Sequence, residues 1–424
     1  MGDVRSRPAS AAAKRGGTGD APIGEAELLD RMRLVGEAFR PAAPIDRRSL
    51  FSGRSEQISE LFSIAAQPGQ HAVIYGERGV GKTSLAAVTA EMLQSANMLA
   101  ARATCDVSDD FGSVWRKALD EIRVHTTTQG LGFTAGTKET SHSAAGLLAD
   151  EVTPHAVRGA LERVSAQRDV VIFIDEFDRL QDSAGRVLFA DTIKMLSDRV
   201  VRVTIGLIGV ADSVSELVRE HRSIERALAQ IHMPRMTRNE LAEIVTRGID
   251  ASQMTIRPEA VRKITALSQG LPHYTQLLTQ LAAQAALTQR RIAVAGRDVD
   301  VAVGRALDRA QQSVVEAYQE ATTDTRRSIY PQVLLACALA PENDFGLFTP
   351  SDVREPLSRI LGKPYKTAAF ARHLDELSQE SRGEVLQKYG TGRTSRYRFL
   401  NPLLQPYVAM RGVSEGLVRV QDLR

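Results

Sequence analysis

The pattern of apolar and polar positions divides the chain into segments of different character. Continuous apolar runs at residues 71–75, 170–174 and 203–210 predict strands that are buried on both faces. Stretches with helical periodicity separate these runs, and one helix is expected to begin at Thr153-Pro154, a cap followed by proline in the first turn. Buried strands that alternate with helices predict an α/β core built on a parallel sheet.

The segments at the start of the chain lack this alternation. Residues 1 to about 21 are rich in Ala, Gly, Ser, Arg and Lys, which predicts a disordered, mildly basic tail. A short amphipathic helix near residues 25–39 and a Pro-bearing connector follow. We therefore expect a tail and short helix over residues 1–45 and the core over residues 46–235. Within the core, the polar and Gly-rich residues 126–146 predict a mobile surface loop.

The second half of the chain is predominantly helical. A capping box at Thr237-Arg238-Asn239-Glu240 opens it, and we expect residues 236–305 to form a helical lid. Residues 306–424 are expected to form a further domain. Its predicted elements are helices near residues 326–338, 350–360 and 366–377 and two short strands at 385–389 and 396–399. Helices followed by a hairpin are typical of a winged helix.

Composition narrows the class of protein. The chain has 424 residues, 43% hydrophobic and 25% charged, which is enough for two or three packed domains. No apolar stretch has the length of a membrane span, so we expect no membrane association. The two cysteines, Cys105 and Cys337, exclude a disulfide framework and a cysteine-based metal site, and they favour a cytoplasmic protein.

Directly after the first apolar run, the chain meets every fixed position of the phosphate-binding motif G-x-x-x-x-G-K-[ST]. The loop and its flank are Gly76, Glu77, Arg78, Gly79, Val80, Gly81, Lys82, Thr83 and Ser84. Glycines let the backbone direct N–H groups at phosphates, Lys82 reaches the β- and γ-phosphates, and the Thr83 hydroxyl ligates Mg²⁺. The motif lies between a predicted strand and a predicted helix, as its chemistry requires. The sequence therefore predicts a site for ATP and Mg²⁺.

A pair of acids about 90 residues further on completes the predicted site. The apolar run at residues 170–174 ends in Asp175-Glu176. In P-loop ATPases, an aspartate at this place holds Mg²⁺ and a following glutamate orients and deprotonates the attacking water. By itself, an apolar run with two acids also fits a core strand with a solvated end. Downstream of a phosphate loop, it predicts Asp175 as a metal ligand and Glu176 as the catalytic base.

Together these motifs resemble those of AAA+ ATPases of the origin-recognition or initiator type and of the related STAND signalling ATPases, over roughly residues 50–411. The stretch Phe51-x-Gly53-Arg54-x-Glu56 is similar to the opening F-x-G-R-x-x-E box, with the acid one residue early. Residues 174–178 are similar to the I-D-E-x-D magnesium motif. The resemblance implies an AAA+ core, a helical lid and a C-terminal winged helix, and it places the opening box beside the adenine.

The resemblance also implies roles for two residues near the end of the core. Asp212 follows the apolar run at residues 203–210, where many relatives carry a polar sensor of the γ-phosphate. Its charge would repel phosphate unless a water, Mg²⁺ or a proton intervenes. Arg226 lies where the family has an arginine finger that acts on a neighbouring subunit, with Arg222 as the rival and an ordinary surface arginine as the alternative.

His273 has two possible assignments. It lies in Gly270-Leu271-Pro272-His273-Tyr274, which resembles the G-x-P motif of STAND ATPases, and it takes the place of a second sensor, an arginine, in initiator-type relatives. A neutral histidine binds phosphate less strongly than an arginine, so we expect slow hydrolysis and switch-like behaviour. A helix start without ligand contact is the alternative.

The charge distribution bears on partners. The whole chain has a net charge of +3, whereas residues 363–411 contain nine Lys or Arg and four acids, a net charge of +5. Basic residues on a helix and a hairpin suit phosphate contacts, so we expect DNA binding by the winged helix, with a protein partner or a solvated hairpin as alternatives. The sequence thus predicts a slow, homo-oligomeric AAA+ ATPase that engages DNA. The alternative is a STAND-type switch that recruits a protein effector.

Overall fold

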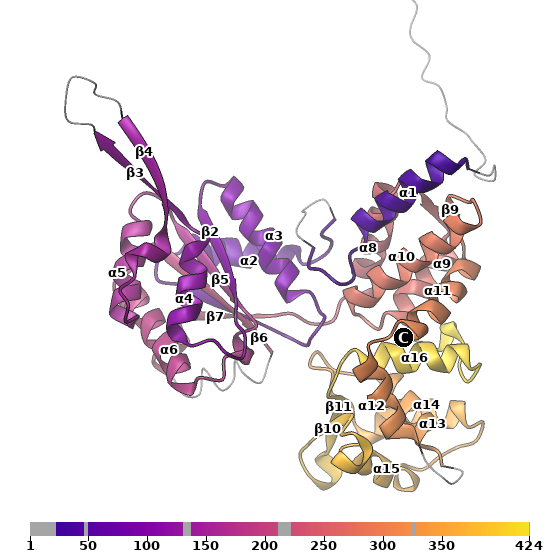
Figure 1. Ribbon diagram of the computed structural model, residues 1–424. Helices are drawn as coiled ribbons and strands as arrows, with labels where there is room; N and C mark the ends of the chain where they lie inside the picture. Colours follow the sequence, from indigo (N-terminus) through magenta and orange to yellow (C-terminus); the bar gives the residue numbers. More distant parts are fainter. Residues whose placement is uncertain (1–22, 46–49, 130–136, 211–221, 324–327, 424) are drawn as a thin grey trace, which may run out of the picture.

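The computed structural model describes residues 23–45, 50–129, 137–210, 222–323 and 328–423 (Figure 1). A five-stranded sheet forms the core, with the order β2-β5-β6-β1-β7 and every neighbouring pair parallel. Its strands are β1 (His71–Tyr75), β2 (Leu99–Thr104), β5 (Val170–Asp175), β6 (Val203–Gly209) and β7 (Leu228–His232). The three predicted apolar runs form the three central strands, which confirms the α/β core with a parallel sheet.

Helices cover both faces of the sheet. One face packs against α2 (Ser55–Ala65) and α3 (Lys82–Ser95). The other packs against α4 (Phe111–Asp120), α5 (Pro154–Val164) and α6 (Ser183–Asp198). Side chains of β5 alternate between these two apolar clusters, as expected for a strand with both faces buried. The predicted cap is confirmed, because the Thr153 side chain accepts a hydrogen bond from the Ala156 N–H at the start of α5.

The prediction of a mobile loop over residues 126–146 is wrong for the residues that the structure describes. They belong to an antiparallel hairpin, β3 (Arg123–Gln129) and β4 (Thr137–Ser143), followed by the short helix η1 (Ala144–Leu147). The hairpin extends away from the core (Figure 1). The run of threonines at 126–128 explains the error, because β-branched residues favour strands and the glycines were given more weight.

The helical lid consists of α8 (Arg238–Ala251), α9 (Pro258–Leu267), α10 (Pro272–Thr288) and α11 (Gly296–Asp308). It also contains two short parallel strands, β8 (Thr255–Ile256) and β9 (Ala293–Val294), which the expected helical lid did not include. The N-terminal helix α1 (Glu25–Ala38) packs against α8 and α10 and is therefore part of this layer. The capping box at the start of α8 is present, with Thr237 and Glu240 bonded reciprocally.

The C-terminal domain combines helices with an antiparallel hairpin. Its elements are α12 (Gln312–Thr322), α13 (Tyr330–Ala338), α14 (Pro350–Ile360), α15 (Ala371–Glu376), β10 (Leu386–Tyr389), β11 (Arg396–Phe399) and α16 (Leu404–Ser414), with short helices η4 (Thr367–Ala369), η5 (Glu380–Arg382), η6 (Gly392–Thr394) and η7 (Val420–Asp422). The helix expected at 366–377 is divided into η4 and α15, because Phe370 leaves helical geometry and is buried between them.

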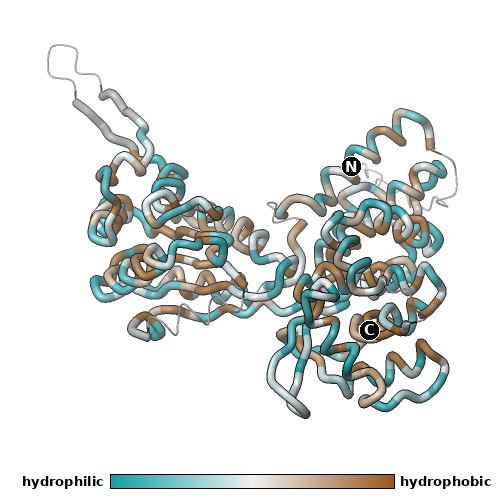
Figure 2. The backbone as a smooth tube through the Cα atoms, turned by 60° about the horizontal axis from the view of Figure 1, so that its bottom comes forward, coloured by the Kyte–Doolittle hydropathy of each residue, from teal (hydrophilic) through white to brown (hydrophobic). Residues whose placement is uncertain are grey.

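The lid and the C-terminal domain share one apolar core. Helix α16 packs against α9 and α11 of the lid as well as against α12 and α13. Figure 2 shows hydrophobic segments in both regions, alternating with hydrophilic ones along the helices. Both cysteines are buried and unbonded. Among the residues described, no helix combines the length and apolarity that crossing a membrane requires.

Candidate nucleotide site

The phosphate loop runs from β1 into α3, and its glycines are required by geometry. Gly79 and Gly81 have φ angles of +87° and +97°, which side chains rarely allow. A Cβ at Gly76 would lie 2.4 Å from the carbonyl oxygen of Met233, so the loop also needs a glycine where it leaves β1. The sequence motif therefore folds into the turn that directs backbone N–H groups toward the start of α3.

Lys82 is the first residue of α3, and its ammonium is turned back toward the loop. The Nζ atom donates hydrogen bonds to the carbonyl oxygens of Gly76 at 2.9 Å and Glu77 at 2.8 Å. Burial lowers the pKa of Lys82, while Asp178 and Asp175 act in the opposite direction. A partly desolvated ammonium in this position attracts phosphate strongly, because little water competes for it.

Asp175 ends β5 beside the loop. Its carboxylate accepts hydrogen bonds from the Thr83 hydroxyl and, at 2.8 Å, from the Glu176 N–H. Burial raises the pKa of Asp175. A carboxylate and a hydroxyl that touch are oxygen ligands of the type that Mg²⁺ prefers, and Mg²⁺ commonly takes one or two protein ligands and completes its shell with phosphates and waters. Thr83 and Asp175 therefore fit the predicted metal.

Glu176 adopts a left-handed backbone conformation, with φ +52°. This conformation costs a non-glycine residue about 1–3 kcal/mol and is typical of functional positions. It allows the side chain to leave the axis of β5, where the carboxylate forms an ion pair of 2.9 Å with Arg179. Both side chains line the nucleotide cavity, so the arginine fixes the direction of the carboxylate.

The nucleotide cavity has a volume of about 620 Å³, a size that accommodates a small organic ligand. Five segments line it: the connector at residues 40–44, the phosphate loop, the end of β5, the end of β6 and the start of α10. From the loop, the lining residues are Arg78, Gly79, Gly81, Lys82, Thr83 and Ser84. The other loop residues face elsewhere, since Val80 is buried in the core and Gly76 and Glu77 line a different cavity.

His273 lines this cavity from the lid and is held by the connector. Its Nδ1 lies 2.8 Å from the carbonyl oxygen of Pro41. A carbonyl oxygen only accepts hydrogen bonds, so Nδ1 carries the proton and Nε2 of the neutral ring is an acceptor. Burial lowers the pKa of His273, which favours this neutral form. A neutral ring with an acceptor at Nε2 attracts phosphate weakly, in line with the predicted contrast to arginine.

The connector is the part of the site that the sequence analysis missed. Arg40 donates its backbone N–H to Gln276 at 3.0 Å, and Gln276 lies one turn after His273 on the same face of α10. The two prolines of residues 41–44 and the spacing between His273 and Gln276 were the available signals. The contacts of Arg40 with Gln276 and of Pro41 with His273 show that the connector and the lid close the cavity together.

The opening box does not lie beside the cavity as the resemblance implied. Its residues are absent from the described lining of the nucleotide cavity. Instead, Arg54 has a left-handed backbone and is only 4% exposed, and it donates hydrogen bonds to the carbonyls of Val80 and Pro234. The carbonyl of Phe51 accepts a bond of 2.8 Å from Arg247 of α8. The box therefore ties the lid to the back of the phosphate loop.

Two predicted residues lie away from the cavity or outside the described part of the chain. Arg226 belongs to the short helix η3 (Arg222–Ala227), its side chain is 83% exposed, and it forms an ion pair of 3.2 Å with Asp198. It does not line the nucleotide cavity of its own chain. Asp212 and the side chain of Arg222 lie outside what the structure describes.

The C-terminal domain contacts the phosphate loop through a polar cluster, which we call the Arg235 bridge. Arg235, in the segment between β7 and α8, forms ion pairs with Glu77 of the loop at 2.5 Å and with Glu342 of the C-terminal domain at 3.1 Å. It also donates a hydrogen bond to Gln405. The three charged side chains are only 12–17% exposed, and burial raises the pKa of Glu342 to about 7.

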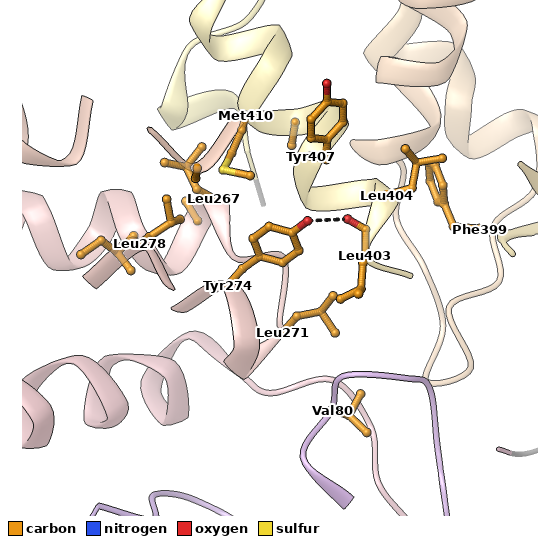
Figure 3. Close-up of a cluster of buried hydrophobic side chains, with 14 of the residues drawn as sticks. Val80, Leu267, Leu271, Tyr274, Leu278, Phe399, Leu403, Leu404, Tyr407 and Met410 are labelled. Atoms are coloured by element: carbon orange, nitrogen blue, oxygen red, sulfur yellow. Dashed lines mark hydrogen bonds between the residues drawn. The ribbon is translucent and has the colours of Figure 1, made fainter. Parts of the chain in front are cut away.

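Apolar contacts reinforce the Arg235 bridge. Figure 3 shows Val80 of the phosphate loop beneath Leu271 and Tyr274 of the lid and Leu403 of the C-terminal domain. The Tyr274 hydroxyl donates a hydrogen bond of 2.8 Å to the Leu403 carbonyl. A Cβ at Gly79 would lie 3.4 Å from the Leu403 side chain. Three regions of the chain therefore converge on one side of the loop.

The basic hairpin is less available for DNA than its sequence indicated. Tyr397 and Phe399 are buried, and Arg396 is exposed. However, Lys388 pairs with Asp375 at 2.6 Å. Arg398 is half-buried, bonds to Gln387 and lines a cavity together with residues of the core.

Sheet order, phosphate loop, acid pair and lid define a P-loop NTPase of the AAA+ type. A family model described as "Novel STAND NTPase 1" matches residues 39–341. The chain belongs to this family of NTPases. No curated protein matches the chain significantly.

Solved structures with similar folds include archaeal proteins. The ORC2 protein of Aeropyrum pernix, in ADPNP–ADP complexes, is 14% identical, with 88% of this chain and 97% of that chain covered and a TM-score of 0.49. Cdc6p of Pyrobaculum aerophilum is 14% identical, with 92% and 99% covered and a TM-score of 0.46. A Walker-type ATPase of Pyrococcus abyssi is 14% identical, with 87% and 98% covered and a TM-score of 0.49.

Proposed function

We propose that this NTPase is a slow, Mg²⁺-dependent ATPase whose nucleotide state sets the position of its C-terminal domain. The Arg235 bridge carries this proposal. Glu77 belongs to the loop that would hold the phosphates, and the same side chain is bonded through Arg235 to Glu342. Any change in the loop on ATP binding or hydrolysis must therefore act directly on the C-terminal domain. This arrangement favours the switch over a motor with an independent ATPase core.

The residues of the cavity have distinct roles in this proposal. Lys82 and the loop N–H groups bind the phosphates, and Thr83 and Asp175 hold Mg²⁺, which offsets negative charge on the phosphates when bound. Glu176, oriented by Arg179, accepts a proton from the attacking water. His273 closes the cavity without adding a positive charge, so hydrolysis is slow.

Assembly of subunits is the second part of the proposal. The exposed Arg226 does not line its own chain's cavity, which suits a finger that enters the cavity of a neighbouring subunit. Such a contribution in trans makes hydrolysis dependent on self-association. Hydrolysis would then be fast only in assembled subunits.

Hydrogen exchange of the full chain tests the switch. We expect Mg²⁺-ATP, compared with Mg²⁺-ADP, to change the protection of the amides around Leu403 and around Gly346, which lies so close to Glu77 that an added Cβ would clash with its carboxylate. Arg235→Ala should change the same amides without nucleotide, while Arg262→Ala, at an exposed position on α9, serves as the control. Identical protection of these amides in both nucleotide states would contradict the proposal.

Binding of DNA by the C-terminal domain, with its winged-helix order of helices and hairpin, is the second candidate. The observation that favours it is the exposed Arg396 on β11. Because Lys388 and Arg398 have partners within the protein, we expect a weak contact of few phosphates. If the protein is instead a STAND-type switch, the same domain would bind a protein effector.

A further inference from the structure

A second cavity, of about 530 Å³, adjoins the nucleotide cavity at the phosphate loop, and Arg78, Asp178 and Val210 line both. We call it the interdomain cavity, because it is lined by Glu77 and Arg78 of the loop, His232 of β7, and Phe345, Arg398 and Leu400 of the C-terminal domain. Its volume falls in the range of about 300–1,000 Å³ that is usual for sites of small ligands. The proposed hydrolysis of ATP does not use the residues of the C-terminal domain that line it.

The apolar part of the interdomain cavity is unusual for a protein surface. Phe345 is 45% exposed and Leu400 is 52% exposed, although most large apolar side chains of the described residues are buried. The Phe345 ring stacks on His232, with centroids 4.9 Å apart and planes tilted by 32°, and His232 stacks in turn on Tyr75 at 5.1 Å. A row of rings that ends in an exposed aromatic residue is a platform for a further planar group.

The charged part of the cavity supplies anchoring groups. Two guanidinium groups line it, Arg78 from the loop and Arg398 from β11, and Gln387 orients the latter. The carboxylate of Glu77 is engaged by Arg235. Guanidinium groups bind phosphates and carboxylates, so the part of the cavity that Arg78 and Arg398 line suits an anionic group.

Two further acids, Asp178 and Asp344, line the cavity, and only Asp344 lies beside the aromatic rings. Asp178 accepts the Val210 N–H at 3.3 Å and acts on Lys82, so the core engages it. Asp344 lies on the ring side of the cavity, close enough to His232 to influence its charge. A carboxylate beside a stacking platform accepts hydrogen bonds from amino groups on the edge of a nucleobase.

We propose that the interdomain cavity is a second ligand-binding site and that its ligand is a nucleobase with an attached anionic group, of the size of a nucleoside monophosphate. The base stacks on Phe345 and Leu400, and the anionic group binds Arg398 and Arg78. The ligand touches both the phosphate loop and the C-terminal domain. Its action as the trigger of the switch rests on the proposed function, whereas its binding does not.

Calorimetry with AMP tests the site on the full chain. AMP is titrated into protein saturated with Mg²⁺ and the non-hydrolysable analogue AMP-PNP, so that the nucleotide cavity is occupied. We expect one equivalent of AMP to bind. Phe345→Ala should weaken this binding about 5- to 150-fold, which corresponds to the loss of about 1–3 kcal/mol of base stacking. Ser313→Trp, at an exposed position on the cavity wall, should abolish it by filling the space.

Matched controls separate the parts of the proposal. Leu417→Ala alters another exposed apolar residue of the same domain and should leave AMP binding unchanged, whereas Leu400→Ala should weaken it. Adenosine and ribose 5-phosphate, which each lack one half of the ligand, should bind more weakly than AMP. Lys82→Ala should retain AMP binding, so failure of the ATP site is distinguished from failure of the second site.

Three outcomes would overturn the proposal. The first is the absence of saturable AMP binding to the loaded protein and to Lys82→Ala. The second is AMP binding that neither Phe345→Ala nor Ser313→Trp affects. In the third, Phe345→Ala alters self-association while AMP does not bind, which would assign the cavity to a second copy of the chain.

Discussion

The two sides of the phosphate loop differ in what they contact. On one side, Lys82 and Thr83 face a polar cavity whose residues match a widespread motif for ATP and Mg²⁺. On the other side, Glu77 and Val80 face the lid and the C-terminal domain through one buried cation and an apolar cluster. The first side determines what the loop binds. The second determines which other part of the molecule responds.

The largest expected effect is that of Lys82→Ala, which tests whether the cavity side of the loop binds ATP. It removes the ammonium on the cavity side and leaves Glu77 and Arg235 in place, so we expect measurable ATP binding to be lost. Glu176→Gln should keep ATP binding and lower kcat by about 10²- to 10⁴-fold, since only the base is removed. Titration with a fluorescent ATP analogue and a phosphate-release assay measure both effects. Equal ATP affinity of wild type and Lys82→Ala would disprove the assignment of the site.

Arg226→Ala tests whether the cavity side is completed by another subunit. Specific ATPase activity should rise with protein concentration, and the variant should lose this rise, because a finger in trans is worth about 10³- to 10⁵-fold in rate. ATP binding to the isolated subunit should not change. Arg199→Ala, at an exposed position at the end of α6, is the control. Constant activity per molecule from nanomolar to micromolar protein would count against the finger.

Arg235→Ala addresses the opposite side of the loop. It leaves Glu77 and Glu342 buried without their cation, and we expect a loss of about 3–5 kcal/mol in the free energy of unfolding, measured with urea. ATP should still bind, because Lys82 and Thr83 are untouched. A double-mutant cycle of Glu77→Gln and Glu342→Gln isolates the coupling across the bridge, with Glu355→Gln in an exposed pair as the control. Additive effects would show that the two sides are not coupled through Arg235.

The pH dependence of the free energy of unfolding tests the burial of Glu342 in the Arg235 bridge. Burial raises the pKa of Glu342 to about 7, from 4.5, so the folded chain holds this proton more tightly than the unfolded chain. The resulting stabilisation is complete below pH 4.5 and is lost as the pH rises through about 7. Relative to wild type, Glu342→Gln should gain about 1 kcal/mol between pH 6 and pH 8 in urea unfolding. A difference that is independent of pH would exclude titration of Glu342 in this range.

The smallest expected effect concerns DNA. If the hairpin contacts a duplex, Arg396→Ala should reduce the slope of log affinity against log salt by about 0.9, the value of one phosphate contact. Arg398→Ala should leave the slope unchanged, because this side chain faces the interdomain cavity. Fluorescence anisotropy over a range of salt concentrations measures both. Equal slopes for wild type, Arg396→Ala and Arg398→Ala would show that the hairpin does not contact DNA.

Local patterns were sufficient to predict the core. The apolar runs, the phosphate motif and the acid pair each depend on contiguous residues, so the three central strands and the loop and acid residues of the cavity were predictable. The edge strands β2 and β7 contain polar residues within short apolar stretches and were not predicted. The hairpin at β3 and β4 was missed because strand propensity and glycine content conflict there. The break at Phe370 arises from burial of one ring between two short helices, which no local pattern indicates.

The contacts of Arg235 could not be predicted for a different reason. Glu77, Arg235 and Glu342 are separated by more than a hundred residues at each step, and each is an ordinary charged residue in its own segment. Their pairing depends on how three regions pack. The same applies to the surroundings of Arg398. The alternation of β11 places this side chain opposite Tyr397 and Phe399, but the core residues that line the same cavity are distant in the sequence.

The order of the strands determines the distance between the phosphate loop and the acid pair. Strand β6 lies between β1, which leads into the phosphate loop, and β5, which ends in the acid pair. Neighbouring strands are about 4.8 Å apart, so the two catalytic segments leave the sheet about 10 Å from each other. Across that distance the side chains of the two segments reach each other, as the contact between Thr83 and Asp175 shows. Adjacent strands would leave half of it, and the interposed strand thus acts as a spacer whose width is fixed by backbone hydrogen bonds.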